Sequence, residues 1–229
     1  MSETTVLVPG FNDDERMVAP LARSLERAGF ATLCVAPQPS NGDAPIELLA
    51  KQLAAAIDNQ LPPEQPLNLV GFSMGGLVCR VYIQQLGGLA RTRRLITLAT
   101  PHQGTYMAYV CERPACVQMR PGSSFLTELN RDLSALHHLQ FTSLWTPFDL
   151  TIVPAMSSVL DVGNARAVFS PFHATLPLDP RIPGLITTAL RRPLSGAGEK
   201  TALPQGPEEQ PMRRQRSLLR QSGQPHHQR

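Results

Sequence analysis

The sequence predicts an α/β fold in which a mostly parallel sheet carries helices on both of its faces. As far as Leu190, short apolar runs alternate with segments whose apolar residues recur at helical spacing. Strands that read as almost continuous apolar runs are typical of parallel sheets that are covered on both sides. In addition, one apolar run leads through a Gly-x-Ser-x-Gly sequence directly into a helical pattern, which indicates a tight strand-to-helix turn.

The expected strands are short apolar runs: Thr5–Val8, Ala31–Ala36, Leu67–Phe72, Leu95–Ala99, Phe141–Trp145 and Ala165–Phe169. The expected helices between them are Arg16–Ala28, Ile46–Ile57, Gly76–Leu86 and Phe125–Leu136. Three of these helices place apolar residues on one face, at Met17, Leu21, Leu25 and Ala28, at Leu48, Leu49, Leu53 and Ala56, and at Phe125, Leu129, Leu133 and Leu136. A last helix, Leu185–Leu190, is expected after Pro183.

The chain has 229 residues, which suits one folded domain with an appendage. We expect residues 1–192 to form the domain. Residues 193–229 are rich in Pro, Gln, Gly and Arg and are expected to form a disordered basic tail, because so few apolar residues cannot offset the entropy of ordering. Arg191–Arg229 holds 8 of the 21 basic and 3 of the 18 acidic residues, so the remainder has a net charge of −2. The overall charge of +3 is therefore poor evidence for a nucleic-acid partner.

The segment Met1–Val8 enters the first strand almost at once and shows no basic stretch followed by an apolar helix. No apolar run approaches the roughly 20 residues of a transmembrane helix, so a cytoplasmic protein is expected. Cys34 and Cys79 lie in apolar patterns and are interpreted as reduced core residues. Cys111 and Cys116 share a loop and could be joined, although a cytoplasmic location disfavours a disulfide.

Ser73 is the predicted nucleophile. It lies at the centre of Gly71-Phe-Ser-Met-Gly75, between an apolar strand and an amphipathic helix. In so tight a turn, side chains two residues before and two after the serine would collide with the neighbouring strand and helix, and glycine has no Cβ to collide. The strained turn is expected to project the Ser73 hydroxyl at the top of the sheet, beside the positive end of the helix.

A serine hydroxyl is a weak nucleophile, so it needs a general base, and the base needs an orienting acid. In folds with this turn the acid follows the serine along the chain and the histidine comes last. Asp149 follows the strand Phe141–Trp145 and is the predicted acid. Asp161 is the alternative, but it lies before the next strand and therefore at the wrong end of it.

His173 is the predicted base, because it follows the strand Ala165–Phe169 and lies downstream of Asp149. The other histidines precede the acid, end a helix or lie in the tail: His102, His137, His138, His226 and His227. An oxyanion hole should combine the backbone N–H of Met74 with one from the loop after the first strand. Pro9 cannot donate there and Gly10 allows close approach, so Phe11 is the expected second donor.

Several segments together resemble bacterial lipases and esterases of the α/β-hydrolase fold, most closely the compact, nearly lidless lipases: Val6–Phe11, Gly71–Gly76, Thr100-Pro-His-Gln-Gly-Thr105, Arg120–Leu126 and the segments around Asp149 and His173. The resemblance covers about residues 4–190. It implies a Ser73, Asp149 and His173 triad. We interpret Thr100–Thr105, which lies where the lipases have a similar loop, as a wall of the pocket. Most relatives have His where this chain has Pro9, so the hydrogen bonding of that loop must differ.

The sequence thus predicts a serine hydrolase that cleaves carboxylic esters through an acyl-enzyme, with an ester or lipid as substrate and no cofactor or metal. Acyl transfer and thioester hydrolysis use the same machinery and remain alternatives, as does a catalytically silent binding protein of the same fold. Only the segment Pro101–Pro121 is available for a cap, which is too short for a lid of several helices.

Overall fold

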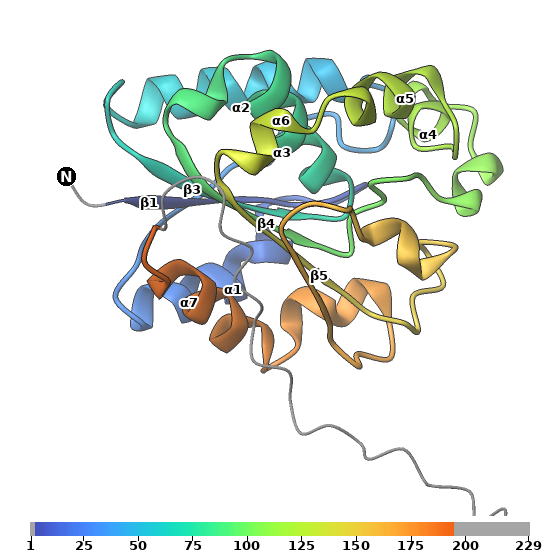
Figure 1. Ribbon diagram of the computed structural model, residues 1–229. Coiled ribbons are helices and arrows are strands. Elements are labelled where there is room, and N and C mark those ends of the chain that lie inside the picture. The colour runs from blue at the N-terminus through green and yellow to red at the C-terminus, as the bar shows by residue number, and fades with distance from the viewer. Residues whose placement is uncertain (1–2, 195–229) are drawn as a thin grey trace, which may run out of the picture.

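The computed structural model describes residues 3–194, and its centre is a sheet of six strands (Figure 1). The strands are β1 (Thr4–Val8), β2 (Ala31–Cys34), β3 (Leu67–Phe72), β4 (Thr92–Leu98), β5 (Gln140–Trp145) and β6 (Asn164–Ala167). They are ordered β2-β1-β3-β4-β5-β6, and every neighbouring pair is parallel. The predicted α/β fold with a mostly parallel sheet is therefore confirmed.

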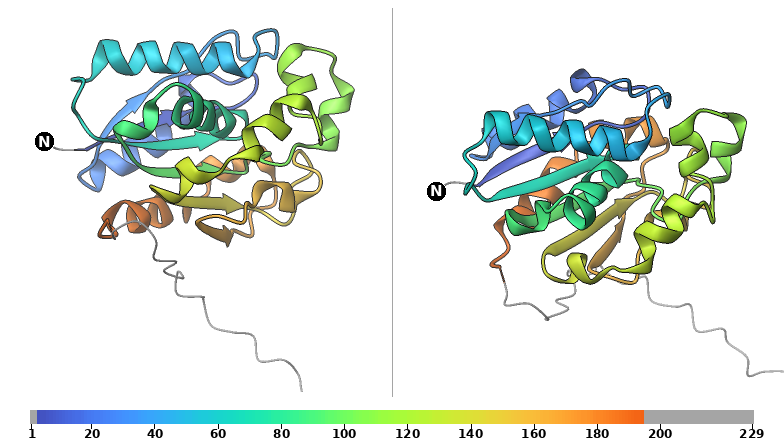
Figure 2. Two further views of the ribbon diagram at one scale, coloured as in Figure 1. Left: turned by 45° about the horizontal axis from the view of Figure 1, so that its top comes forward. Right: turned by 90° about the horizontal axis from the view of Figure 1, so that it is seen from above.

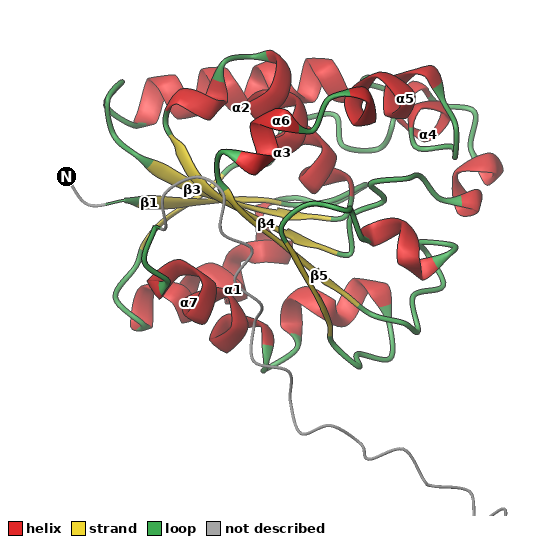
Figure 3. Cartoon of the chain, viewed as in Figure 1, coloured by secondary structure: helices red, strands yellow, loops and turns green. Residues whose placement is uncertain are grey.

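Helices cover both faces of the sheet, as the layers in Figure 3 show. The α-helices are α1 (Glu15–Arg27), α2 (Ile46–Gln60), α3 (Met74–Gln85), α4 (Pro114–Gln118), α5 (Ser124–Arg131), α6 (Ser134–His137) and α7 (Ile182–Arg191). Short 3₁₀ helices lie in the connections at η1 (Gly88–Ala90), η2 (Tyr106–Val110), η3 (Ala155–Ser158) and η4 (His173–Leu178). Helices α2, α3, α5 and α6 lie on one side of the sheet, and α1 and α7 lie on the other (Figures 1 and 2).

Alternation along the strands builds two separate apolar cores, one on each side of the sheet. Val6 and Val8 pack into the core under α2 and α3, whereas Leu7 between them joins the core under α1 and α7. The same alternation separates Leu69 from Val70 in β3. These side chains are almost completely buried, which contributes roughly 1.5–3 kcal/mol for each of them.

The structure corrects several predicted boundaries. The expected helix Phe125–Leu136 is two helices, α5 and α6, because Asp132 between them is extended and its carboxylate accepts the N–H of Ser134. Strand β4 begins at Thr92 rather than Leu95. Helix α7 begins at Ile182, so Pro183 lies in its first turn, where the missing N–H costs nothing. Of the expected tail, residues 195–229 lie outside the described part.

Between the end of β4 and the start of α5, the chain carries only η2 and the short α4, so the segment available for a cap is as small as the sequence predicts. The four cysteines are free thiols, so the structure contains no disulfide between Cys111 and Cys116. Within residues 3–194, no helix combines the length and the apolar composition that crossing a membrane would require.

Candidate active site

The candidate site lies at the carboxyl ends of the strands, next to the point where the strand order reverses. From β1 the chain continues to β2 on one side, whereas from β3 it continues to β4 on the other side, so the loops that leave β1 and β3 run in opposite directions. In open parallel sheets such a reversal opens a crevice that ligands use. The loop after β1 carries Gly10 and Phe11, and the loop after β3 carries Ser73.

Ser73 occupies the turn between β3 and α3 with φ +52° and ψ −123°, a backbone conformation that residues other than glycine rarely adopt. The two glycines around it are required, as predicted. A Cβ on Gly71 would lie 2.5 Å from the Cα of Gly76, and one on Gly75 would overlap the carbonyl oxygens of Val8 and Pro9. The turn therefore depends on close backbone contacts to helix α3 on one side and to the end of β1 on the other.

The structure brings Ser73, His173 and Asp149 into one chain of hydrogen bonds. The Oγ of Ser73 lies 3.0 Å from Nε2 of His173, and Nδ1 of the same ring lies 2.8 Å from Oδ2 of Asp149. Because a carboxylate only accepts, Nδ1–H donates to Asp149 and Nε2 is left to accept the Ser73 hydroxyl proton. This is the tautomer that a general base at His173 requires.

Asp149 is held in place by its own loop. Its Oδ1 accepts the backbone N–H groups of Thr151 (2.9 Å) and Ile152 (2.8 Å), while Oδ2 faces the histidine. The side chain of Asp149 is 1% exposed and that of His173 is 10% exposed. The His173 ring also packs against Phe72, with ring centroids 5.0 Å apart. Asp149 and His173 are thus fixed by packing as well as by hydrogen bonds.

The loop after β1 lies against the serine. A Cβ on Gly10 would lie only 3.0 Å from the Cβ of Ser73, so glycine permits this approach. Within the described residues, the backbone N–H groups of Phe11 and Met74 have no hydrogen-bond acceptor. Both N–H groups of the predicted oxyanion hole are therefore without a partner in the described part of the chain.

His102 is placed away from this chain of hydrogen bonds. It is completely buried, with Nε2 3.1 Å from the Thr97 hydroxyl and Nδ1 3.5 Å from the guanidinium of Arg80. Burial and, to a lesser degree, the charge of Arg80 hold the pKa of His102 well below its usual range. Arg80 is itself fully buried, and desolvation lowers its pKa to about 9. His102 and Arg80 thus form a buried pair that supports the loop after β4, which is the role we assign to the Thr-Pro-His sequence.

The remaining alternatives also lie elsewhere. Asp161 is exposed and precedes β6, at the amino-terminal end of that strand as the sequence predicts. His137 and His138 are exposed at the end of α6. His226 and His227 lie outside the described residues.

Sequence reasoning missed the contribution of Thr105. Its hydroxyl donates to the carbonyl of Thr151 (2.7 Å) and accepts the N–H of Val153 (2.9 Å), which ties η2 to the loop that holds Asp149. These partners are more than 40 residues away in the chain, so no local pattern could have indicated them. Arg80 did carry a signal, because it interrupts the apolar run Leu77–Val81 in α3.

The fold and the arrangement at the serine define a protein of the α/β-hydrolase class. The palmitoyl protein thioesterase family model matches residues 4–155, and the chain belongs to this family of hydrolases. His173 lies beyond the matched segment. The predicted likeness to lipases and esterases is confirmed at the level of fold and hydrolase family.

Solved structures of lipases share the fold at low sequence identity. Lipase B of Aspergillus fumigatus is 18% identical with a TM-score of 0.71, over 87% of this chain and 54% of its own, so this chain spans about half of that enzyme. The mature lipase BlEst2 of Bacillus licheniformis is 14% identical with a TM-score of 0.67, over 82% of this chain and 92% of its own. A lipase-esterase related protein of Clostridium acetobutylicum is 14% identical with a TM-score of 0.57, over 83% and 94%. No curated protein matches the sequence.

Proposed function

We propose that the protein is a serine hydrolase that cleaves carboxylic esters or thioesters through an acyl-enzyme, with Ser73 as nucleophile, His173 as general base and Asp149 as orienting acid. The observation that carries this proposal is the chain of hydrogen bonds from Ser73 through His173 to Asp149. The three residues come from three separate loops, and they meet at the carboxyl edge of the sheet with the ring in the required tautomer.

In the proposed reaction, Ser73 Oγ attacks the acyl carbon while its proton moves to Nε2 of His173. The resulting imidazolium faces the Asp149 carboxylate. The tetrahedral oxyanion accepts the N–H groups of Phe11 and Met74. The C–O or C–S bond to the leaving group then breaks, and the proton on Nε2 passes to the departing alkoxide or thiolate. Water attacks the acyl-enzyme by the same route and releases the acid and free Ser73.

The surface around the site favours a substrate with an apolar acyl group. Of the 14 large apolar side chains that are exposed among the described residues, 11 lie in the loops and 3₁₀ helices that follow the carboxyl ends of β1, β4, β5 and β6. They are Phe11, Tyr106, Met107, Tyr109, Val110, Phe148, Leu150, Met156, Phe169, Phe172 and Leu178. An acyl chain gains about 0.8 kcal/mol for each methylene that such residues cover.

Thioester cleavage is supported by a specific observation, since the matching family is named for a palmitoyl protein thioesterase. Ester cleavage is supported by the fold shared with the lipases. Both reactions use the same acyl-enzyme and differ in the leaving group. A long-chain acyl thioester and a nitrophenyl ester of the same chain length, compared by kcat/KM on one preparation, would rank the two.

Labelling with a fluorophosphonate probe tests the proposal directly. The parent protein should be labelled at Ser73 and should hydrolyse nitrophenyl esters, whereas Ser73→Ala should lose labelling and lower turnover by about 10⁴-fold or more, because covalent catalysis is lost. Equal turnover by Ser73→Ala and the parent would refute the assignment. An unlabelled, inactive but folded parent would instead favour the silent binding protein.

A further inference from the structure

The loop after β1 carries a carboxylate that the proposed triad does not use. Oδ2 of Asp13 accepts the backbone N–H of Gly10 at 3.2 Å, three residues earlier in the same loop. Partial burial raises the pKa of Asp13, whereas the hydrogen bond from Gly10 and the charge of the nearby His173 act in the opposite direction. Asp13 therefore lies near His173 and is hydrogen-bonded to the backbone of its own loop.

Gly10 connects this carboxylate to the serine. The position of a Cβ on Gly10 would lie 3.0 Å from the Ser73 Cβ and 3.1 Å from Oδ2 of Asp13. Gly10 thus lies close to both the Asp13 carboxylate and the Ser73 side chain. The peptide that follows Gly10 carries the N–H of Phe11, so a restraint on Gly10 also restrains the proposed oxyanion donor.

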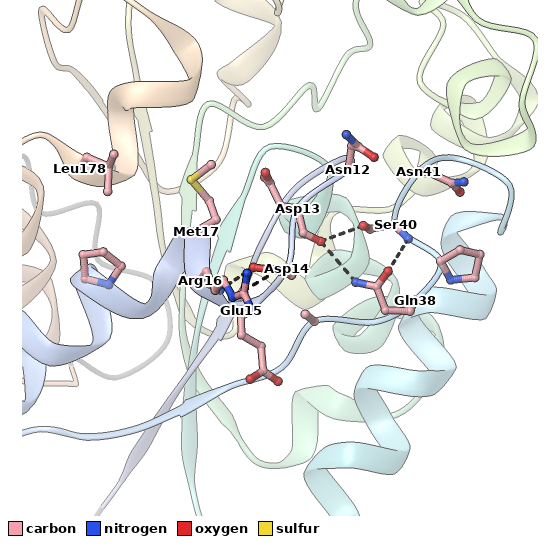
Figure 4. Close-up of a pocket in the computed structure, with 13 residues that line it drawn as sticks. Asn12, Asp13, Asp14, Glu15, Arg16, Met17, Gln38, Ser40, Asn41 and Leu178 are labelled. Carbon is pink, nitrogen blue, oxygen red and sulfur yellow. Dashed lines mark hydrogen bonds and ion pairs between the residues drawn. The ribbon is translucent and has the colours of Figure 1, made fainter.

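The backbone of Asp13 is fixed by a second loop, which follows β2. The Asp13 carbonyl accepts the Ser40 hydroxyl at 2.8 Å and the Gln38 side-chain amide at 3.3 Å (Figure 4). The N–H of Asn12 donates to the Ser40 carbonyl at 2.8 Å. Gln38 is held in turn, because its N–H donates to the side chain of Gln52 at 2.7 Å. The carboxylate of Asp13 is therefore presented from a backbone that cannot easily shift.

The backbone N–H groups of Gly10 and Phe11 differ in their hydrogen bonding. Pro9 has no N–H, so Gly10 and Phe11 supply the only donors at the start of the loop. The Gly10 N–H is bound by Asp13, whereas the Phe11 N–H has no acceptor within the described residues.

We propose that Asp13 is a positioning residue of the oxyanion hole, which holds the Gly10 N–H and thereby keeps the Phe11 N–H directed at the tetrahedral intermediate. This inference rests on the proposed acyl-enzyme mechanism. A donor that is fixed before the reaction stabilises the transition state without a cost of reorganisation. Asp13 thus acts on turnover through the backbone and does not touch the reacting atoms.

The test is steady-state hydrolysis of a nitrophenyl ester by Asp13→Ala and Asp13→Asn. Asp13→Ala should lower kcat by about 10- to 100-fold with KM within about twofold of the parent, because the lost restraint acts in the transition state. The amide oxygen of Asp13→Asn can still accept the Gly10 N–H, so this variant should stay within about threefold of the parent kcat. A loss that appears in KM alone, or an Asn variant as slow as the Ala variant, would overturn the proposal.

Asp14→Ala is the matched control, because Asp14 is the neighbouring carboxylate but caps α1 by accepting the N–H of Arg16. It should lower the melting temperature and leave kcat unchanged. An equal loss of kcat in both alanine variants would overturn the specific role of Asp13.

If Asp13→Ala does not fold, Ser40→Ala replaces it. Ser40→Ala should lower kcat several-fold at constant KM. Parent-like turnover by Ser40→Ala would then count against the proposal. Fluorophosphonate labelling of the parent keeps the outcomes separate, since an unlabelled parent refutes the acyl-enzyme itself.

Discussion

At the scale of single residues, the site depends on how each polar side chain is supported. Asp149 accepts hydrogen bonds from two backbone N–H groups of its own loop and from His173, and its side chain is almost completely buried. A buried carboxylate with this many donors is held in one orientation. Asp161, the alternative acid, is exposed and lies at the opposite end of the sheet. The burial of Asp149 and its three hydrogen-bond donors therefore favour it over Asp161 as the orienting acid.

Asp149→Asn should lower kcat for ester hydrolysis by about 10³- to 10⁴-fold, because an amide can donate to Nδ1 and so stabilise the wrong tautomer of His173. Asp161→Asn is the matched control and should keep nearly the parent rate. Steady-state kinetics on both folded variants decide between the two carboxylates. The reverse ranking would assign the acid to Asp161.

At the scale of elements, the connection between β3 and α3 is the part of the fold in which local backbone geometry matters most. Ser73 has a positive φ, and the helix starts at the very next residue. Helix α3 therefore directs its free N-terminal amides and its positive end at the serine. This geometry is possible only because the backbone of α3 approaches the end of β1 at Gly75.

Gly75→Ala should lower the free energy of unfolding by more than about 2 kcal/mol, because the added Cβ meets backbone carbonyl oxygens that no rotamer change can clear. Gly184→Ala is the control, since Gly184 lies inside α7 with nothing within 4 Å of the new Cβ. It should leave stability unchanged or raise it by about 0.5–1 kcal/mol. Urea unfolding of both variants measures the difference, and equal stabilities would contradict the close contact at Gly75.

At the scale of the whole molecule, the strand order determines which loops meet. Placing β1 and β3 side by side brings Gly10 to Ser73, and adding β4, β5 and β6 on one side brings the loops with Asp149 and His173 to the same edge. The opposite edge of the sheet has a different role. There the buried Arg94 side chain binds Glu3 and the backbone carbonyl of Arg192, which ties both ends of the described chain to β4.

This contact determines where a shortened chain should begin to lose stability. A chain that ends at Leu194 should keep the parent melting temperature within about 2 °C and keep ester hydrolysis, because residues 195–229 have too few apolar residues to supply a core. Ending the chain at Arg191 also removes the carbonyls of Arg192 and Pro193, which accept from Arg94 and Gln140. That shorter chain should lose about 1–3 kcal/mol of stability, since Arg94 keeps a buried donor without its partner. A large loss in the longer truncation would show that the tail docks.

Much of this protein could be predicted from local patterns. Strand and helix periodicity depends on residues a few positions apart, so the main elements and the two-sided burial were predicted, apart from shifted ends, the break between α5 and α6, and the short α4. The elbow around Ser73 is likewise a local property, because its glycines are required by their nearest neighbours. Chain order then indicated Asp149 and His173 as the partners, although it could not measure their distances.

The remaining features depend on contacts between distant segments, which no local pattern encodes. His173 meets Ser73 across 100 residues of sequence, and Thr105 meets the Asp149 loop across more than 40. The burial of His102 beside Arg80, which separates that histidine from the site, appears only when α3 packs on the sheet. The bond from Gly10 to Asp13 spans three residues, yet its importance depends on Ser73 and Ser40, which come from other loops. Local sequence determines which elements form, and the strand order determines which of their loops converge on one site.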